Sequence, residues 1–366
     1  LPKTVIKLTD EIYQKGEKER NSAQMLKAYM WRMKTQDILT PDSFYVGLRD
    51  LEQWAKQTEQ PMDRAILHSL IAEFYANYAA DNQWQLRQRT EIVGETPSAD
   101  IREWTANMFV EKVRTNVKEA LADSLLLLKT SSRNYIPFVE LGETSEYYHH
   151  DMYHLLASRA VRALNQIERL ERGSFNGITV SPVKQDITNI YERMADAYET
   201  AGLKEGYVLT MLQYLEWERG NDNKLQPVQL KKGLGEWTAD TYNAALDELK
   251  RQFKSEPICA EVYLAQARYA VEKMQQVNAL QLCDEAFRLY PGYRRINALK
   301  NLREEILAPF LNVSAVSQAF PNEEIKLNVG HKNLDGFTVR LYQAKKLVKE
   351  QHYSVLRPKD YRAKDT

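Results

Sequence analysis

The stretch Ala260-Glu261-Val262-Tyr263-Leu264-Ala265-Gln266-Ala267 is followed by Ala279, Ala286 and Pro291-Gly292. Small residues recur here at spacings that place them on one face of each of two consecutive helices. Small side chains on a shared face let two antiparallel helices approach closely, and a proline after the second helix cannot continue it. The stretch therefore predicts a helical hairpin over 260–292, and this hairpin decides the fold class.

These offsets, together with the aromatic residue Tyr263, resemble the 34-residue tetratricopeptide repeat. Weaker copies of its first helix occur at 71–75 (Ile-Ala with a following Tyr) and at 191–198 (Tyr, Met-Ala, Tyr). The copies are irregularly spaced, which is typical of a degenerate array. We predict a solenoid of helical hairpins over residues 1–308, in preference to a compact bundle.

Helical periodicity extends through most of this region. Pro41, after the capping residue Thr40, and Pro61 each predict a helix start, because proline lacks the N–H that would have no partner there. The predicted apolar faces are Val5, Leu8 and Ile12; Leu26, Tyr29, Met30 and Met33; Phe44, Leu48, Leu51 and Ala55; and Leu67, Leu70, Phe74 and Tyr78. Further helical runs are predicted over 99–129, 145–171, 184–200, 203–219 and 236–254.

After Pro309 the hydrophobic period changes from that of a helix to that of a strand. Apolar and polar residues alternate over 325–329 and 337–341, and Asn333-Leu334-Asp335-Gly336 lies between them as a turn. Alternation on both sides of such a turn predicts a β-hairpin. Further strands are predicted at 311–315 and 353–356. The fold class is therefore mostly α, followed over 309–366 by a partial antiparallel β-sandwich.

The composition is that of a folded protein with interleaved charges. Hydrophobic residues make up 43 % and charged residues 27 % of the 366. Lys plus Arg equals Asp plus Glu, at 50 each, so the basic surplus typical of nucleic-acid binders is missing. No stretch approaches the roughly 18 consecutive apolar residues of a membrane span. We expect neither a nucleic-acid partner nor a membrane span in this chain.

The alternating segments carry a family resemblance. Residues 320–329 (Phe-Pro-Asn-Glu-Glu-Ile-Lys-Leu-Asn-Val), with Asn333-Leu334 and Val339-Arg340-Leu341-Tyr342, resemble the opening strands of the first macroglobulin-like domain of bacterial alpha-2-macroglobulins. The likeness is to the Bacteroidetes branch, in which a long helical region precedes that domain. It implies a large protein of the periplasm or cell envelope that traps proteases of broad specificity after its bait region is cut. The chain begins Leu1-Pro2, and we expect it to be an amino-terminal, truncated piece of such a parent.

Many members of this family carry a Cys-x-Glu-Gln thioester in a much later domain. Cys259-Ala260-Glu261-Val262 matches its first and third positions, but Val262 stands where the acyl-donating Gln is required. No trapping residue can therefore be carried over to this chain. We predict a non-catalytic scaffold without a cofactor, which positions the downstream macroglobulin-like domains and docks envelope proteins or proteases.

The two cysteines, Cys259 and Cys283, are predicted to be free thiols. In the helical-hairpin register they are separated by roughly 10 Å along the helix axis. A disulfide needs Cα atoms within about 7 Å of each other. Cys283 shares the apolar face of Ala279 and Ala286, so we predict that it belongs to the core.

A cluster of tyrosines and histidines at 147–154 (Tyr-Tyr-His-His-Asp-Met-Tyr-His) allows two interpretations. On a helix, His150 and His154 would share a face at a spacing used by metal sites, and Glu146 could be a third ligand. The alternative is an amphipathic seam between helices, which we favour. Two other functions stay open: a hydrolase centred on His149–His154, and a module that binds a peptide or glycan on a face lined by aromatic residues such as Trp84 and Trp104.

Overall fold

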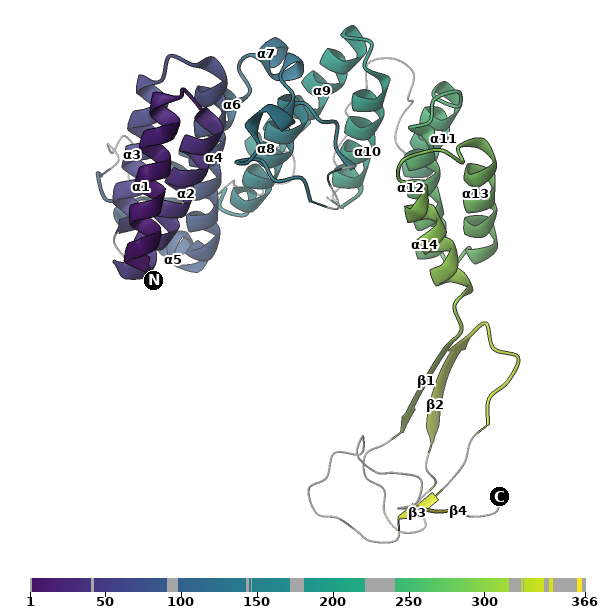
Figure 1. Cartoon of the computed structure of the whole chain (residues 1–366). Helices are drawn as coiled ribbons and strands as arrows, with labels where there is room; N and C mark the ends of the chain where they lie inside the picture. The colour runs from purple at the N-terminus through teal and green to yellow at the C-terminus, as the bar shows by residue number, and fades with distance from the viewer. Residues whose placement is uncertain are drawn as a thin grey trace. The chain divides into compact units, whose positions relative to one another are not determined.

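The computed structural model describes residues 2–40, 43–90, 98–142, 145, 147–171, 181–220, 241–315, 324, 326–338, 342–344 and 361–363. Over these residues the protein is mostly helical, with short antiparallel strand pairs near its carboxyl end (Figure 1). The chain divides into two compact units, Leu1–Asn297 and Ala298–Thr366. The predicted boundary after residue 308 follows the change from helix to strand, whereas this division lies inside the last helix.

The first unit is built from helices. In chain order they are α1 (Pro2–Lys18), α2 (Ser22–Leu39), α3 (Ser43–Gln57), α4 (Pro61–Asp81), α5 (Gln83–Gln88), η1 (Ile101–Glu103), α6 (Ala106–Ala120), α7 (Ser124–Lys129), η2 (Ser132–Tyr135), α8 (Met152–Glu168), α9 (Pro182–Thr200), α10 (Lys204–Gly220), α11 (Thr241–Gln252), α12 (Cys259–Glu272) and α13 (Gln276–Leu289); α14 (Ile296–Leu307) begins in this unit and ends in the second.

Polar side chains and prolines set several helix starts. Asn21, Asp123, Asp151 and Ser181 each accept a hydrogen bond from a backbone N–H in the first turn of the helix that follows, where the helix itself offers no acceptor. Pro61 is the first residue of α4, as predicted. The other predicted start, Pro41, lies outside the described residues.

Helices of the first unit pack mainly on their neighbours in the chain. Contacts link α1 to α2, α2 to α3, α3 to α4, α4 to α6 and α8, α8 to α9, α9 to α10, and α12 to both α11 and α13. Leu67 and Leu70 are buried as predicted, and Phe74 and Tyr78 are half-buried. On α1, however, Leu8 and Ile12 are about half exposed, because α1 packs chiefly on α2 and this contact covers only part of its apolar face.

The predicted hairpin at 260–292 is confirmed as α12 and α13. Ala260, Ala267, Ala279 and Ala286 are almost completely buried, and α12 packs against α13. The rings of Tyr263 and Tyr290 lie 5.9 Å apart, at the end of the hairpin away from its connecting turn at 273–275. Neither Cys259 nor Cys283 forms a disulfide, as predicted; Cys283 is buried as predicted, and Cys259 is buried too.

Two predicted helices differ from the structure. The run 99–129 is interrupted after Glu103 and again at 121–123, so it forms η1, α6 and α7. The run predicted from residue 145 begins only at Met152. Residues 130–132 pair with 150–152 through hydrogen bonds from Ser132 N–H to His150 O and from Met152 N–H to Thr130 O. This pairing holds the segment before α8 in an extended conformation.

The described residues of the second unit form the rest of α14 and the short strands β1 (Phe310–Ala315), β2 (Leu327–Lys332), β3 (Tyr342–Ala344) and β4 (Tyr361–Ala363). β1 pairs with β2, and β3 with β4, both antiparallel. The predicted pairing of 325–329 with 337–341 is therefore wrong for its described part: Leu327 and Val329 pair with β1, and Phe337 is not in a strand. The strand predicted at 353–356 lies outside the described residues.

Asn333 explains why the predicted turn is not the observed one. Its φ is +53°, a left-handed conformation that asparagine tolerates better than most residues. Its side-chain amide donates to Ile306 O at 2.7 Å and Ala308 O at 3.3 Å. These are carbonyls at the end of α14, so Asn333 ties the end of β2 to the helix that precedes β1.

Candidate functional site

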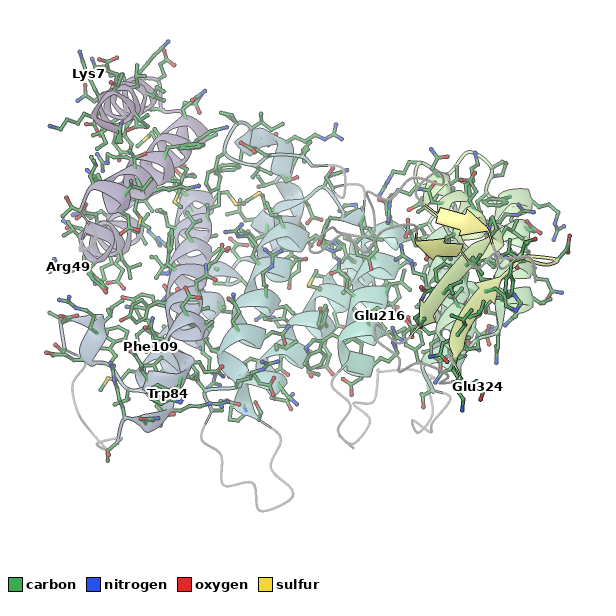
Figure 2. All side chains as sticks on the ribbon, turned by 90° about the horizontal axis from the view of Figure 1, so that it is seen from below. Lys7, Arg49, Trp84, Phe109, Glu216 and Glu324 are labelled. Atoms are coloured by element: carbon green, nitrogen blue, oxygen red, sulfur yellow. The ribbon has the colours of Figure 1, made fainter. Side chains whose placement is uncertain are left out.

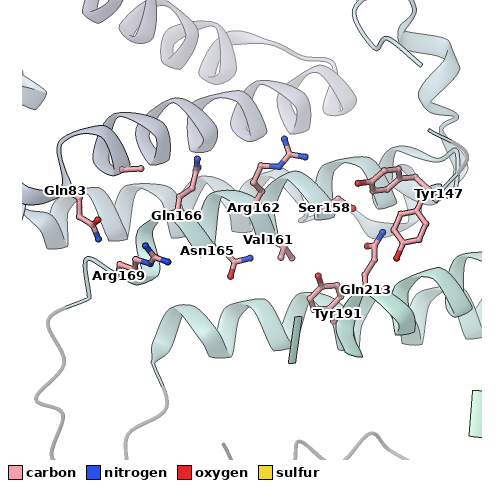
Figure 3. Close-up of a pocket in the computed structure, with 12 residues that line it drawn as sticks. Gln83, Tyr147, Ser158, Val161, Arg162, Asn165, Gln166, Arg169, Tyr191 and Gln213 are labelled. Carbon is pink, nitrogen blue, oxygen red and sulfur yellow. The ribbon is translucent and has the colours of Figure 1, made fainter. Parts of the chain in front are cut away.

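A groove of about 650 Å³ runs along helix α8 (Figure 3). Five parts of the first unit contribute to it: the end of α4 with the start of α5, the segment before α8, α8 itself, α9 and α10. Its lining residues are Ala80, Gln83, Tyr147, Tyr148, Ser158, Val161, Arg162, Asn165, Gln166, Arg169, Tyr191 and Gln213. Polar groups that can bind a ligand therefore meet here from distant parts of the sequence.

Helix α8 and Arg169, the residue that follows it, supply a row of polar side chains to this groove. Ser158, Arg162, Asn165 and Arg169 are spaced by four, three and four residues, so they lie on one line of the helix. In Figure 3 the side chains of the row diverge: Arg162 extends to one side of the helix, together with Gln166, and Asn165 extends to the other side, together with Val161. The row is about 16 Å long, at 1.5 Å per residue.

The groove is positively charged. Arg162 and Arg169 are exposed, and the lining contains no acidic residue. The sole acidic residue of α8, Glu168, forms an ion pair with Lys184 of α9 at 3.2 Å. Another arginine of α8, Arg159, is half-buried and forms an ion pair with Glu73 of α4. The charges of Arg159 and Glu168, which fix α8 to its neighbours, are thus neutralised by ion pairs. The groove lining contains no acidic residue that would neutralise Arg162 and Arg169 in the same way.

Two amide side chains are oriented by neighbours that fix which atom faces the groove. The Trp217 indole N–H donates to Asn165 Oδ1 at 3.0 Å; since an indole can only donate, the Asn165 amino group is left for other partners. Gln213 Oε1 lies 3.2 Å from His154 Nε2. His154 Nδ1 accepts from the His149 backbone N–H at 3.4 Å, so a neutral ring carries its proton on Nε2 and donates to Gln213.

Two polar atoms in the groove are buried without a partner. Ser158 Oγ and Gln166 Oε1 have no hydrogen-bond partner, although Gln166 Nε2 donates to Asn77 of α4 at 2.9 Å. A buried polar atom without a partner costs free energy, and a ligand or water that bonds to it removes that cost. These atoms indicate a ligand or water position beside α8.

Tyrosines form the wall at one end of the groove. Tyr147 and Tyr148 meet edge to face at 5.6 Å, and Tyr191 packs on Tyr214 and Trp217. The Arg295 guanidinium lies 5.0 Å from the centre of the Tyr147 ring and forms an ion pair with Glu261 at 2.9 Å. This contact connects the α12–α13 hairpin to the groove wall. Burial, with Glu261 nearby, raises the pKa of Tyr147 to about 12.

Asp151 lies buried behind this wall and forms hydrogen bonds with several segments. It is 3 % exposed, and its carboxylate accepts from the His154 backbone N–H at 2.7 Å and from the Tyr198 hydroxyl at 2.9 Å. Its Oδ2 also lies 2.7 Å from His149 Nδ1. This hydrogen bond raises the pKa of His149. Asp151 therefore joins the start of α8, helix α9 and the segment that carries the groove tyrosines.

His154 is fully buried, and burial lowers its pKa to about 4. An unfolded chain takes up a proton at an ordinary histidine near pH 6.5, whereas the folded chain does so only near pH 4. Between these values the unfolded state binds more protons, so stability falls as the pH falls. A buried neutral imidazole thus makes this region sensitive to acid.

We expect the substitution His154→Gln to remove part of this acid sensitivity. The wild-type free energy of unfolding should fall by about 2–3 kcal/mol more than that of the variant between pH 6.5 and pH 4. Urea unfolding followed by circular dichroism at several pH values measures the difference. Parallel pH profiles of the two proteins would contradict this assignment of His154.

The structure contradicts the helix geometry that the metal alternative at 147–154 requires. His150 precedes the start of α8, so it does not share a helix face with His154. His154 is enclosed and bonded to Gln213, and the predicted third ligand, Glu146, lies outside the described residues. No group of three or more His, Cys, Asp or Glu side chains among the described residues is arranged to hold a metal ion. The interpretation as a seam between helices fits the contacts of His149 and His154.

The predicted aromatic residues and the hydrolase centre fall outside the groove. Trp84 is 73 % exposed (Figure 2), whereas Trp104 is buried and stacks on Tyr75 at 5.2 Å. The two do not form one exposed aromatic patch, because Trp104 belongs to the core around Phe109. The hydrolase alternative requires a deep pocket at 149–154, and the groove lining includes Tyr147 and Tyr148 but none of the three histidines.

Comparison with known proteins leaves the family open. The chain matches no protein-family model, no curated protein and no solved structure. The alpha-2-macroglobulin resemblance therefore stays a prediction. Within the described residues, no helix is both long and apolar enough to cross a membrane.

Apart from Tyr147 and Tyr148, which belong to the predicted cluster at 147–154, sequence reasoning missed the residues that line the groove. The signal within α8 was present: Ser158, Arg162, Asn165 and Arg169 form a polar row on the side of the helix opposite the buried residues Leu156, Ala160 and Leu164. Such a row is typical of any solvated helix face. Gln83, Tyr191 and Gln213 join it only through the packing of α5, α9 and α10.

Proposed function

We propose that the chain is a non-catalytic, tetratricopeptide-like scaffold of a large alpha-2-macroglobulin-like protein of the cell envelope, which traps endopeptidases. The observation that carries the proposal is the α12–α13 hairpin, with its four alanines buried between two antiparallel helices. Packing of most helices on their chain neighbours supports a repeat array, in which each unit contacts mainly the next.

The strand pair β1–β2 supports the same proposal. It follows the helical region directly, and Phe310, Leu311, Val313 and Leu327 on it are about half exposed. A two-stranded ribbon is marginally stable alone and needs further strands or helices to cover its apolar residues. A macroglobulin-like sandwich that begins with this strand pair would supply those further strands.

Reading the gene beyond codon 366 tests this proposal. We expect an open reading frame that encodes several further β-domains and, in a late one, a Cys-x-Glu-Gln motif or a bait region. A stop codon immediately after codon 366, or a following domain of an unrelated class, would contradict the family assignment.

A second candidate function, a helical module that binds a peptide or glycan, is favoured by the α8 groove. Its volume, its oriented amides and its wall of tyrosines suit a polar, extended ligand. Peptide and glycan arrays probed with the protein and with Asn165→Ala test this function. Array signals that are lost in the variant support it. Identical signals for both proteins, or none for either, count against it.

A further inference from the structure

The groove along α8 presents mainly hydrogen-bond donors. The Arg162 and Arg169 guanidinium groups and the amino groups of Asn165 and Gln213 all carry N–H donors. The orienting bonds donated by Trp217 and His154 use the acceptor oxygens of these two amides. A ligand that complements such a surface must be rich in acceptors and, facing two arginines, negatively charged.

The spacing of the two arginines sets the spacing of charges on the ligand. They are seven residues apart on one line of α8, which corresponds to about 10 Å along the helix. A polyproline-II peptide rises about 3.1 Å per residue with three residues per turn. Acidic side chains three residues apart in such a peptide therefore share one face and lie about 9 Å apart, close to the distance between the arginines.

The length of the row sets the length of the ligand. The 16 Å from Ser158 to Arg169 accommodates five or six residues of extended chain, at about 3.1–3.3 Å per residue. The amino groups of Asn165 and Gln213 can donate to backbone carbonyls of such a segment. Gln166 Oε1, which has no partner, can accept from a backbone N–H. Alternating donors and acceptors of this kind match a peptide backbone.

We propose that the α8 groove binds a short, extended acidic peptide segment of a partner protein, with two carboxylates three residues apart on Arg162 and Arg169. This inference rests on the second candidate function and is independent of the scaffold role. Each arginine offers a planar pair of N–H donors that suits a carboxylate in two-point contact. Tyr147 and Tyr148 close one end of the groove and pack against the ligand.

Fluorescence anisotropy with two matched peptide pools tests the proposal. The first pool contains blocked, labelled hexapeptides with Glu at positions two and five and an equal mixture of residues elsewhere. The second pool has Gln at both positions. We expect the acidic pool to bind about ten-fold more tightly than the Gln pool at low salt, because each arginine–carboxylate contact contributes a few-fold. The difference should shrink as the salt concentration rises.

Arginine variants separate a local site from general charge attraction. In Arg162→Gln/Arg169→Gln the preference for the acidic pool should disappear. The control Arg49→Gln/Arg133→Gln removes the same charge from exposed residues on α3 and η2 (Figure 2 labels Arg49), and it should keep the preference. All four residues are exposed, so both variants should fold, and matching circular dichroism spectra verify this.

The remaining outcomes all overturn the proposal, and they do so differently. Equal binding of both pools that is lost in Asn165→Ala keeps a binding module but removes the acidic ligand class. Loss of the preference in both double variants means general charge attraction. No binding of either pool, or binding of an acidic oligosaccharide in place of the peptides, excludes an acidic peptide ligand.

Discussion

The substitution Asp151→Ala is expected to lower the stability of the α8–α9 region by about 3–5 kcal/mol. The change removes the acceptor for the first turn of α8 and leaves the buried Tyr198 hydroxyl and the His149 ring without their partner. Hydrogen exchange followed by mass spectrometry, on peptides from α8 and α9, measures the local free energy of opening. A loss below about 1 kcal/mol would show that the hydrogen bonds of Asp151 do not stabilise the α8–α9 region as proposed.

The variant Asp151→Asn is the matched control. It keeps an acceptor oxygen for the helix start and for Tyr198, so we expect a smaller loss, about 1–2 kcal/mol. The carboxylate raises the pKa of His149, so its contribution to stability is fully present below the ordinary histidine pKa. That contribution is lost as the pH rises through the higher folded-state value. The difference between Asp151→Asn and wild type should therefore be larger at pH 6 than at pH 9.

The substitution Gly206→Ala is expected to destabilise the contact between α9 and α10 by about 2 kcal/mol. A Cβ at Gly206 would overlap the ring of Tyr198, which is fully buried and bonded to Asp151. Overpacking of this kind typically costs about 1–3 kcal/mol, although alanine gains up to about 1 kcal/mol of helix propensity. Thermal unfolding followed by circular dichroism reports the change in melting temperature.

The control for this prediction is Gly47→Ala on α3. The added Cβ would meet the Met33 side chain at 2.9 Å, and a methionine can adopt another rotamer at little cost. We expect unchanged or slightly increased stability, because alanine favours the helix. An equal loss in the two variants would show that the Tyr198 contact is not specific.

The α12–α13 hairpin and the start of α4 could be predicted because their signals are local. The alanines at 260, 267, 279 and 286 lie within one hairpin, and its closing Pro291 is adjacent in sequence. Pro61 likewise marks the start of α4 without help from distant residues. Each of these features depends on contacts between segments that are close in the chain.

The parts of the structure that differ from the sequence predictions depend on contacts between residues that are far apart in the chain. The start of α8 is set by Asp151 and by the pairing of 150–152 with 130–132, which the helical pattern from residue 145 does not contain. The register of β2 depends on Asn333 reaching the end of α14. The groove combines α5, α8, α9 and α10, so its lining follows from packing that one sequence pattern does not reveal.

The measurement that tests the scaffold role most directly is a protease-trapping assay on the full-length product of the gene. The product is incubated with a protease and then assayed with a large protein substrate and with a small chromogenic peptide. We expect cleavage of the large substrate to fall while cleavage of the small one continues, and we expect the 366-residue chain alone to change neither. Inhibition by this chain alone, or full activity toward both substrates with the full-length product, would contradict the scaffold role.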